Sequence, residues 1–248
     1  MALTYIDIDQ QCSIYHQTLQ INDEFFERLT LSWLYHDHAL EGQVVEPQDI
    51  DRALRGMPGR NYCDRMLLHS LSAQRQAIDF IHDEAQRDSS IDLDWLRDLH
   101  RRLCPEDAER PGCYRKRQTS PGVYHLDVVP PSSVSYHAHK FIDALDDELG
   151  SMHPIRRAAF AHWEFMRLFP FDERTGQVGR LMLNFLLIKH RFPPAIIHAT
   201  ERQSYFDALN GHRADMVPVV TDAIRATLEA AKKVHASHRP TSRRRAAY

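Results

Sequence analysis

The chain has 248 residues and a mass of 28.9 kDa, enough for one large domain or two small ones. Hydrophobic residues make up 43% of it and charged residues 26%, which is the composition of a soluble globular protein. The net charge of −3 excludes broad nonspecific binding of nucleic acid, which needs a strong basic excess, so no nucleic-acid partner is expected.

Apolar residues at helical spacing dominate the first hundred residues. Four helices are predicted there, at 21–42, 45–54, 64–86 and 89–104. The first should end at Gly42, because glycine tolerates the left-handed conformation that often follows a helix. Pro47 suits the first turn of the second helix. The fourth has serines as candidate N-terminal caps and Pro105 beyond its end.

Residues 111–133 break the helical pattern. They hold four of the 13 prolines and the alternating sequence GVYHLDVV, which favours a β-hairpin or flap. Helices then resume and are predicted at 135–150, 153–169, 175–190, 200–211 and 216–236. The chain shows no internal repeat. The predicted fold class is therefore mainly α, a single domain over 1–248 with one short β flap.

Location is suggested by what the sequence lacks. No stretch approaches about 18 uninterrupted apolar residues, and the first residues have no basic and apolar leader, so no membrane association is expected. The four cysteines show no C-x-x-C pairing, which favours reduced thiols in a cytoplasmic protein. The basic end of the chain, within 237–248, is interpreted as a solvated tail.

The sequence LFPFDERTGQVGRLMLN, at 168–184, is a loop that leads into a helix. The first N–H groups of a helix have no partners within it, so such a junction can bind an anion. Two glycines, a cation and two carboxylates lie there: Gly176, Gly179, Arg180, Asp172 and Glu173. This set suits a phosphate with a divalent metal. The spacing alone favours the other interpretation, a surface loop whose acids offset the helix dipole.

A second unusual feature is Glu41, at the end of the helix predicted over 21–42. A carboxylate is unfavourable at a helix C-terminus, so we expect either a compensating arginine from elsewhere or a solvated side chain. His36 and His38 lie beside it in YHDHALEG and are candidate pocket-lining residues, together with Asp37 and the distant Tyr205.

These segments, in this order, resemble the Fic (Fido) family. The family signature H-P-F-x-D/E-G-N-G-R-x-x-R aligns with FPFDERTGQVGR without insertion or deletion, within a helix-loop-helix at 154–190. PGCYRKRQTSPGVYHLDVVPP resembles the family's substrate-docking flap. YHDHALEGQVVEP resembles its N-terminal inhibitory helix, placed here within 1–60. The resemblance covers about residues 25–230 and implies a Fic-type helical domain.

Members of this family typically transfer AMP from ATP to a protein hydroxyl. The resemblance implies that a histidine takes the hydroxyl proton, that the Gly-Asn-Gly amides hold the phosphates, and that arginines stabilise the charge. It also implies Mg²⁺ with a nucleotide as the cofactor, held by an acidic residue, and a protein target docked on the flap.

This sequence departs from the signature at four positions. The histidine is replaced by Phe169, the first glycine by Arg174, the asparagine by Thr175 and the first arginine by Gln177. The acidic residue is retained as Glu173, which the resemblance implies is a metal ligand. The second glycine and the last arginine are retained as Gly176 and Arg180. The inhibitory glutamate is retained as Glu41, with Asp37 where serine or threonine is usual.

These departures argue against AMP transfer. Phenylalanine accepts no proton, and general-base catalysis typically contributes ~10²–10⁴-fold. Arg174 adds a side chain where an anion would approach bare backbone. Gln177 removes a fixed positive charge that would stabilise the transition state.

Two explanations remain for the retained pair of Glu41 and Arg180. A buried ion pair is costly to half-remove, at about 3–5 kcal/mol, so both members can persist for structural reasons. Alternatively, Glu41 has become an acid/base and Arg180 an anchor in an enzyme with changed chemistry. The sequence favours this second explanation, because new polar groups replaced the lost ones.

The substrate of such an enzyme would carry a phosphate or a carboxylate. The substrate would be bound by two arginines and by polar and backbone groups at the start of the helix predicted over 175–190. These residues are Arg174, Thr175, Gly176, Gln177, Gly179 and Arg180. One alternative is a non-catalytic descendant that binds a nucleotide or a protein partner. A second is residual nucleotidyl transfer with another base.

Overall fold

The computed structural model describes residues 5–104, 110–119 and 121–238. Within these ranges the chain forms α-helices and short 3₁₀ turns and no β-strand, which confirms the predicted mainly helical class. The helices are α1 (Ile6–Ile21), α2 (Asp23–Leu40), α3 (Pro47–Leu54), α4 (Tyr62–Gln86), α5 (Leu93–Leu103), α6 (Val134–Asp146), α7 (Pro154–Leu168), α8 (Thr175–Lys189), α9 (Arg202–Asn210) and α10 (Met216–His238).

Side-chain caps fix the starts of several helices. The Asn22 side chain accepts a hydrogen bond from the backbone N–H of Phe25 and so begins α2. The Asp92 carboxylate accepts one from Trp95 at the start of α5, so aspartate caps this helix and the predicted serine caps are wrong. At the other end of α2, Gly42 has the expected left-handed backbone, with a φ of +79°.

The first helix, α1, was not predicted, because its sequence is rich in polar residues and its apolar positions are few. It is nevertheless held in place by α10, against which it packs. Ile8 and Tyr15 are buried, and the Thr18 hydroxyl donates a hydrogen bond to the Ala231 carbonyl of α10. The tertiary contact with α10 therefore overrides a weak local pattern.

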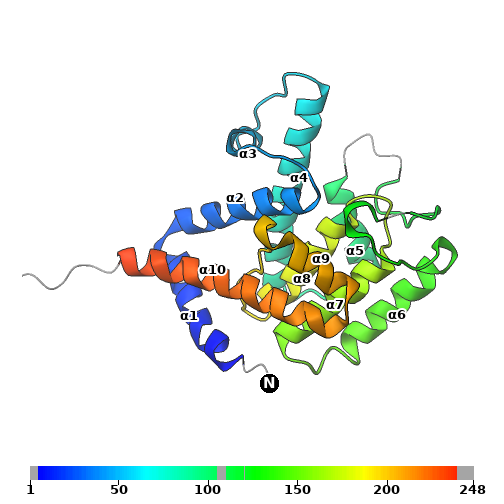
Figure 1. Ribbon diagram of the computed structural model, residues 1–248. Coiled ribbons are helices and arrows are strands. Elements are labelled where there is room, and N and C mark those ends of the chain that lie inside the picture. The colour runs from blue at the N-terminus through cyan, green and yellow to red at the C-terminus, as the bar shows by residue number, and fades with distance from the viewer. Residues whose placement is uncertain (1–4, 105–109, 120, 239–248) are drawn as a thin grey trace, which may run out of the picture.

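The core is built around α8. Figure 1 shows this helix enclosed by its neighbours, and its closest packing is with α7 and then α4. Every residue from Thr175 to Leu187 is buried, which is unusual for a helix that carries polar side chains. Those side chains must therefore find partners within the protein. Asn184, for example, exchanges two hydrogen bonds with the backbone of Ala195.

The predicted β flap at 111–133 is wrong. In its described part, this segment forms two 3₁₀ turns, η1 (Gly122–Tyr124) and η2 (Pro131–Ser133), and residues 125–130 between them form neither helix nor strand. The four prolines explain the difference, because each lacks the N–H group that a paired strand donates. The segment is held by side chains instead, as described below.

Two further sequence predictions concern membrane-spanning helices and the basic tail. Among the described residues, none of the helices is long and apolar enough to cross a bilayer. Most of the basic tail predicted at 237–248, from residue 239 onward, lies outside the described residues.

Candidate functional site

The guanidinium group of Arg180 is the centre of the candidate site. It lies in the first turns of α8 and is only 3% exposed. Nε donates to the Asp37 carboxylate, Nη2 donates to Glu41 Oε1 at 2.6 Å, and Nη1 donates to the Tyr124 hydroxyl at 2.7 Å. We call these four residues the Arg180 cluster. The cluster joins α8 to the end of α2 and to the 111–133 segment, and Glu41 has the arginine partner that its place at a helix end predicts.

Tyr124 is the member of the cluster that sequence reasoning missed. Its hydroxyl donates to Glu41 Oε1 at 2.5 Å while accepting from Arg180. Burial raises the pKa of Tyr124 well above its ordinary value, so the hydroxyl stays protonated. A neutral donor of this kind satisfies a carboxylate oxygen without adding charge to the cluster.

The N-terminus of α8 faces this cluster directly. A Cβ atom at Gly176 would overlap both the Tyr124 hydroxyl and the Glu41 carboxylate, so only glycine allows their close approach. The carboxylate of Glu41 therefore lies where the free N–H groups of α8 would attract an anion. In this structure, the predicted anion position is filled by side chains of the protein itself.

The three polar replacements in the signature also bond to the protein. Arg174, at φ +60°, donates from Nη1 to the Ser70 hydroxyl at 2.8 Å and to Gln177 Oε1 at 3.0 Å. Gln177 donates to Gln74 of α4 at 3.4 Å. The Thr175 hydroxyl donates to the Phe171 carbonyl at 3.0 Å and accepts from the Phe171 N–H.

His38 extends this network into α2. Its Nδ1 lies 2.9 Å from the Leu34 carbonyl, which can only accept, so Nδ1 carries the proton. Nε2 then accepts from the Ser70 hydroxyl at 3.1 Å, and Ser70 in turn accepts from Arg174. Burial lowers the pKa of His38, which is consistent with this neutral form. The chain of bonds ties the start of α8 to α2 through α4.

Phe169 is the residue that the sequence alignment predicts at the place of the family's histidine. Its backbone is left-handed, with a φ of +43°, and its ring is buried and meets the Tyr124 ring edge-on at 6.4 Å between centroids. The Phe169 carbonyl accepts from Arg115 Nε at 2.7 Å. Arg115 also donates to the Val129 carbonyl, and its backbone N–H donates to Pro170. One buried arginine thus attaches residues 169–174, which we call the signature loop, to the 111–133 segment.

A histidine supports the loop from the opposite side. Phe171 stacks on the ring of His100 at 3.9 Å between centroids, and the rings are 4° from parallel. His100 Nδ1 accepts from the Gly112 N–H at 2.8 Å. Burial lowers the pKa of His100 to about 4, so this imidazole is neutral at physiological pH.

The lowered pKa of His100 predicts a loss of stability in acid. The unfolded chain binds a proton near pH 6.5 and the folded protein only near pH 4, so the contribution of His100 is complete above pH 6.5 and falls between these values. Within this range, His100 should lower the free energy of unfolding by about 1.4 kcal/mol for each unit by which the pH falls. We expect urea unfolding at pH 6 and 5 to show a slope smaller by about this amount in His100→Gln. Equal slopes in the two proteins would contradict the assignment.

The remaining predicted site residues described here, Tyr205, His36 and Gly179, have different neighbours. Tyr205 is fully buried beside it, and its hydroxyl lies 2.8 Å from Nε2 of the core histidine His162. His36 instead stacks on His198 and accepts from the Ala199 N–H. Gly179 faces α7, where a Cβ would meet the Phe165 ring at 3.1 Å, so this glycine permits close helix packing.

Glu173 was predicted as a metal ligand. Its side chain is exposed, and among the described residues no group of three or more His, Cys, Asp or Glu side chains is arranged to hold a metal. Mg²⁺ is commonly held by one or two carboxylates together with phosphates and water. Because Glu41 and Tyr124 fill the predicted anion position at the start of α8, the residues as arranged here do not fit a Mg²⁺–nucleotide complex.

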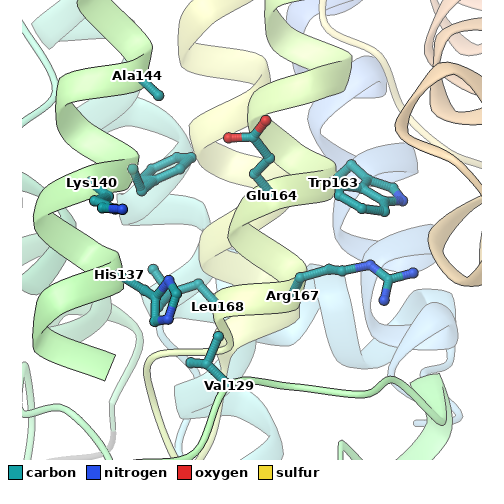
Figure 2. Close-up of a pocket in the computed structure, with 9 residues that line it drawn as sticks. Val129, His137, Lys140, Ala144, Trp163, Glu164, Arg167 and Leu168 are labelled. Carbon is teal, nitrogen blue, oxygen red and sulfur yellow. The ribbon is translucent and has the colours of Figure 1, made fainter. Parts of the chain in front are cut away.

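A cavity of about 350 Å³ lies on the other side of the signature loop, between α6 and α7. Figure 2 shows His137 of α6 beside Leu168 at the end of α7, with Lys140 above His137 on α6 and Val129 below. Val129 belongs to the 111–133 segment, and its N–H donates to the Arg167 carbonyl. The cavity therefore adjoins both the signature loop and the segment that resembles the docking flap.

Comparison with known proteins identifies this architecture. The sequence model of the Fic/DOC family matches residues 90–187. A protein adenylyltransferase Fic of Nematostella vectensis is 28% identical over 221 residues, which are 84% of this chain and 48% of that protein. The fic-1 protein adenylyltransferase of Caenorhabditis elegans is 27% identical over 76% of this chain and 38% of its own length. The chain thus spans about half or less of the curated relatives it matches.

Solved structures agree in fold. A Fic-domain signaling protein from Bacteroides thetaiotaomicron superposes with a TM-score of 0.75 at 20% identity, covering 92% of this chain and 96% of that one. Fic-1 from C. elegans superposes with a TM-score of 0.74 at 22% identity, covering 92% and 70%. The described chain therefore has the fold of these Fic-domain proteins. Residues 90–187 are therefore similar in sequence to the Fic/DOC family.

Proposed function

We propose that this protein does not transfer AMP, and that it acts as a non-catalytic Fic-fold protein whose signature site is closed by its own side chains. The named relatives are adenylyltransferases, so the ancestral reaction is the reference. Phe169 offers no atom that can accept the proton of an attacking hydroxyl. The bonds of its carbonyl to Arg115 and its packing on Tyr124 give it a structural role instead.

One observation supports a non-catalytic protein rather than an enzyme with changed chemistry. The polar side chains that replaced the family's residues bond to the protein scaffold: Arg174 to Ser70, Gln177 to Gln74 and Thr175 to the backbone of Phe171. Buried polar groups that are satisfied internally rigidify a structure and offer little to a ligand. The replacements therefore support the stability of the closed loop.

Opening the site should expose the anion position. We expect Glu41→Gly combined with Tyr124→Ala to bind ATP with Mg²⁺ at least about tenfold more tightly than the wild type. The substitutions free two donors of Arg180 and the first N–H groups of α8, and they remove a repelling carboxylate. Isothermal titration gives both affinities, and Glu24→Gly on the exposed face of α2 is the matched control. Equal affinity of the wild type and the double variant would show that the site is not closed.

An enzyme with changed chemistry is the second candidate, and one observation favours it. The Glu41 side chain is 21% exposed although it bonds a buried arginine, so an acid/base group reaches solvent beside a fixed cation. Such a site would act on a phosphate- or carboxylate-bearing substrate. A screen of phosphorylated and carboxylated metabolites decides the matter. Turnover by the wild type that Glu41→Gln abolishes without unfolding the protein would establish this candidate.

The parts of the chain divide the proposed role among them. We propose that residues 1–248 act as one Fic-like unit, in which 1–60 supply the inhibitory-type helix and 154–190 the closed signature. A protein partner would dock on 111–133, with the cavity of Figure 2 beside it. The names of the relatives, which are protein adenylyltransferases, support a protein as the partner class.

A further inference from the structure

A second cavity, of about 410 Å³, lies outside the Arg180 cluster. It is bounded by the first half of α10, by the chain before η3 (Ala199–Glu201), and by the start of α9, which lies beside α10 in Figure 1. Its apolar walls are Ile196, Ile197, Pro218, Val219, Ala223 and Ala226. This volume and this lining fall in the range of small-molecule sites.

The charged side chains that line this cavity are acidic. Glu201 and Asp222 border it, and none of its described lining residues is a lysine or an arginine. Within the described residues, no ion pair involves Glu201. Asp222 pairs with Arg225 at 3.1 Å, but the Asp222 side chain is 72% exposed, so this pair neutralises the carboxylate weakly. Negative charge beside an apolar wall repels anions and attracts a cation that has an apolar body.

We infer that this cavity binds a small organic amine. The ammonium group of the amine would pair with Glu201 and Asp222. The apolar part of the amine would pack on Ile196 and Ile197. The apolar burial and the charge pairing are independent contributions, so each can be removed separately by substitution. This inference does not depend on whether the signature site is catalytic.

The NMR resonances of two neighbouring histidine rings can show whether a ligand occupies the cavity. His198 borders the cavity and stacks on His36 at 4.1 Å between centroids, with the planes 13° apart. His36 belongs to α2, the helix that ends at Glu41. A ligand against His198 should therefore shift the ring resonances of both histidines.

The probe for the test is phenethylamine, with phenethyl alcohol and phenylacetate as neutral and anionic counterparts. Calorimetric titration of the full chain should show binding of the amine at least about tenfold tighter than that of the alcohol. The acetate should not bind. Two-dimensional NMR should show shifts at His36 and His198 with the amine. Absence of amine binding up to about 10 mM, or equal binding of all three compounds, would overturn the inference.

Substitutions locate the site. Glu201→Gln and Asp222→Asn should each weaken amine binding about fivefold, because each removes a partial ion pair. Ala226→Leu should abolish binding by filling the cavity from its exposed edge, where it does not disturb the core. Glu229→Gln removes the same charge from α10 outside the cavity and should change nothing. Binding that survives Ala226→Leu, or that weakens equally in Glu229→Gln, would refute the location. Thermal melting confirms that each variant is folded.

Discussion

Replacing Arg180 with methionine is expected to lower the free energy of unfolding by about 3–5 kcal/mol. The substitution leaves two carboxylates facing each other without a cation, and Asp37 is only 2% exposed. Glu41 and the Tyr124 hydroxyl lose the same partner. Urea unfolding followed by circular dichroism measures the effect.

The matched control is Arg55→Met. Arg55 also pairs with an aspartate, but both side chains are exposed, so the expected change is below about 1 kcal/mol. Adding Asp37→Asn and Glu41→Gln to Arg180→Met should recover part of the loss, because the uncompensated charges are removed. A cost no larger than that of the control would mean that the cluster does not stabilise the fold.

Replacing Arg115 with methionine is expected to cost about 3–5 kcal/mol as well. Each lost bond to a charged donor is worth about 1.5–3 kcal/mol, and the buried carbonyls of Phe169 and Val129 would both lose theirs. Arg115→Lys should rescue little, because an ammonium cannot bridge two carbonyls as the planar guanidinium does. Hydrogen exchange should become faster in the described part of 111–133.

Lys116→Met is the control for this prediction. Lys116 is the exposed neighbour of Arg115, so its replacement should leave both stability and hydrogen exchange unchanged. If Arg115→Lys matched the wild type, a single positive charge would suffice and the bridging role would be refuted.

Helical periodicity was sufficient to place nine of the ten helices in the described chain, because a buried stripe repeats every three or four residues. It failed for α1, whose contact with α10 is not encoded locally, and for 111–133, where prolines prevent strand pairing. The bond between Glu41 and Arg180 was foreseeable, since a carboxylate at a helix end needs a partner and the family resemblance names one.

Other site residues could not have been found in this way. Tyr124 looked like part of an alternating strand, and its hydroxyl meets Glu41 across 83 residues of chain. Ser70 and Gln74 lie on α4 at positions typical of a helix facing other helices, and nothing nearby in sequence indicates Arg174 or Gln177 as partners. Contacts between polar groups from distant segments depend on the fold, and a single sequence does not reveal them.

The most direct test is an AMP-transfer assay with ATP labelled at the α-phosphate and a panel of candidate target proteins. The wild type should attach no label, because Phe169 cannot take the hydroxyl proton. A variant with the family signature restored (Phe169→His, Arg174→Gly, Thr175→Asn, Gln177→Arg) and Glu41→Gly is the positive comparison and should label itself or a target. Robust labelling by the wild type that persists in Phe169→Ala would contradict the account.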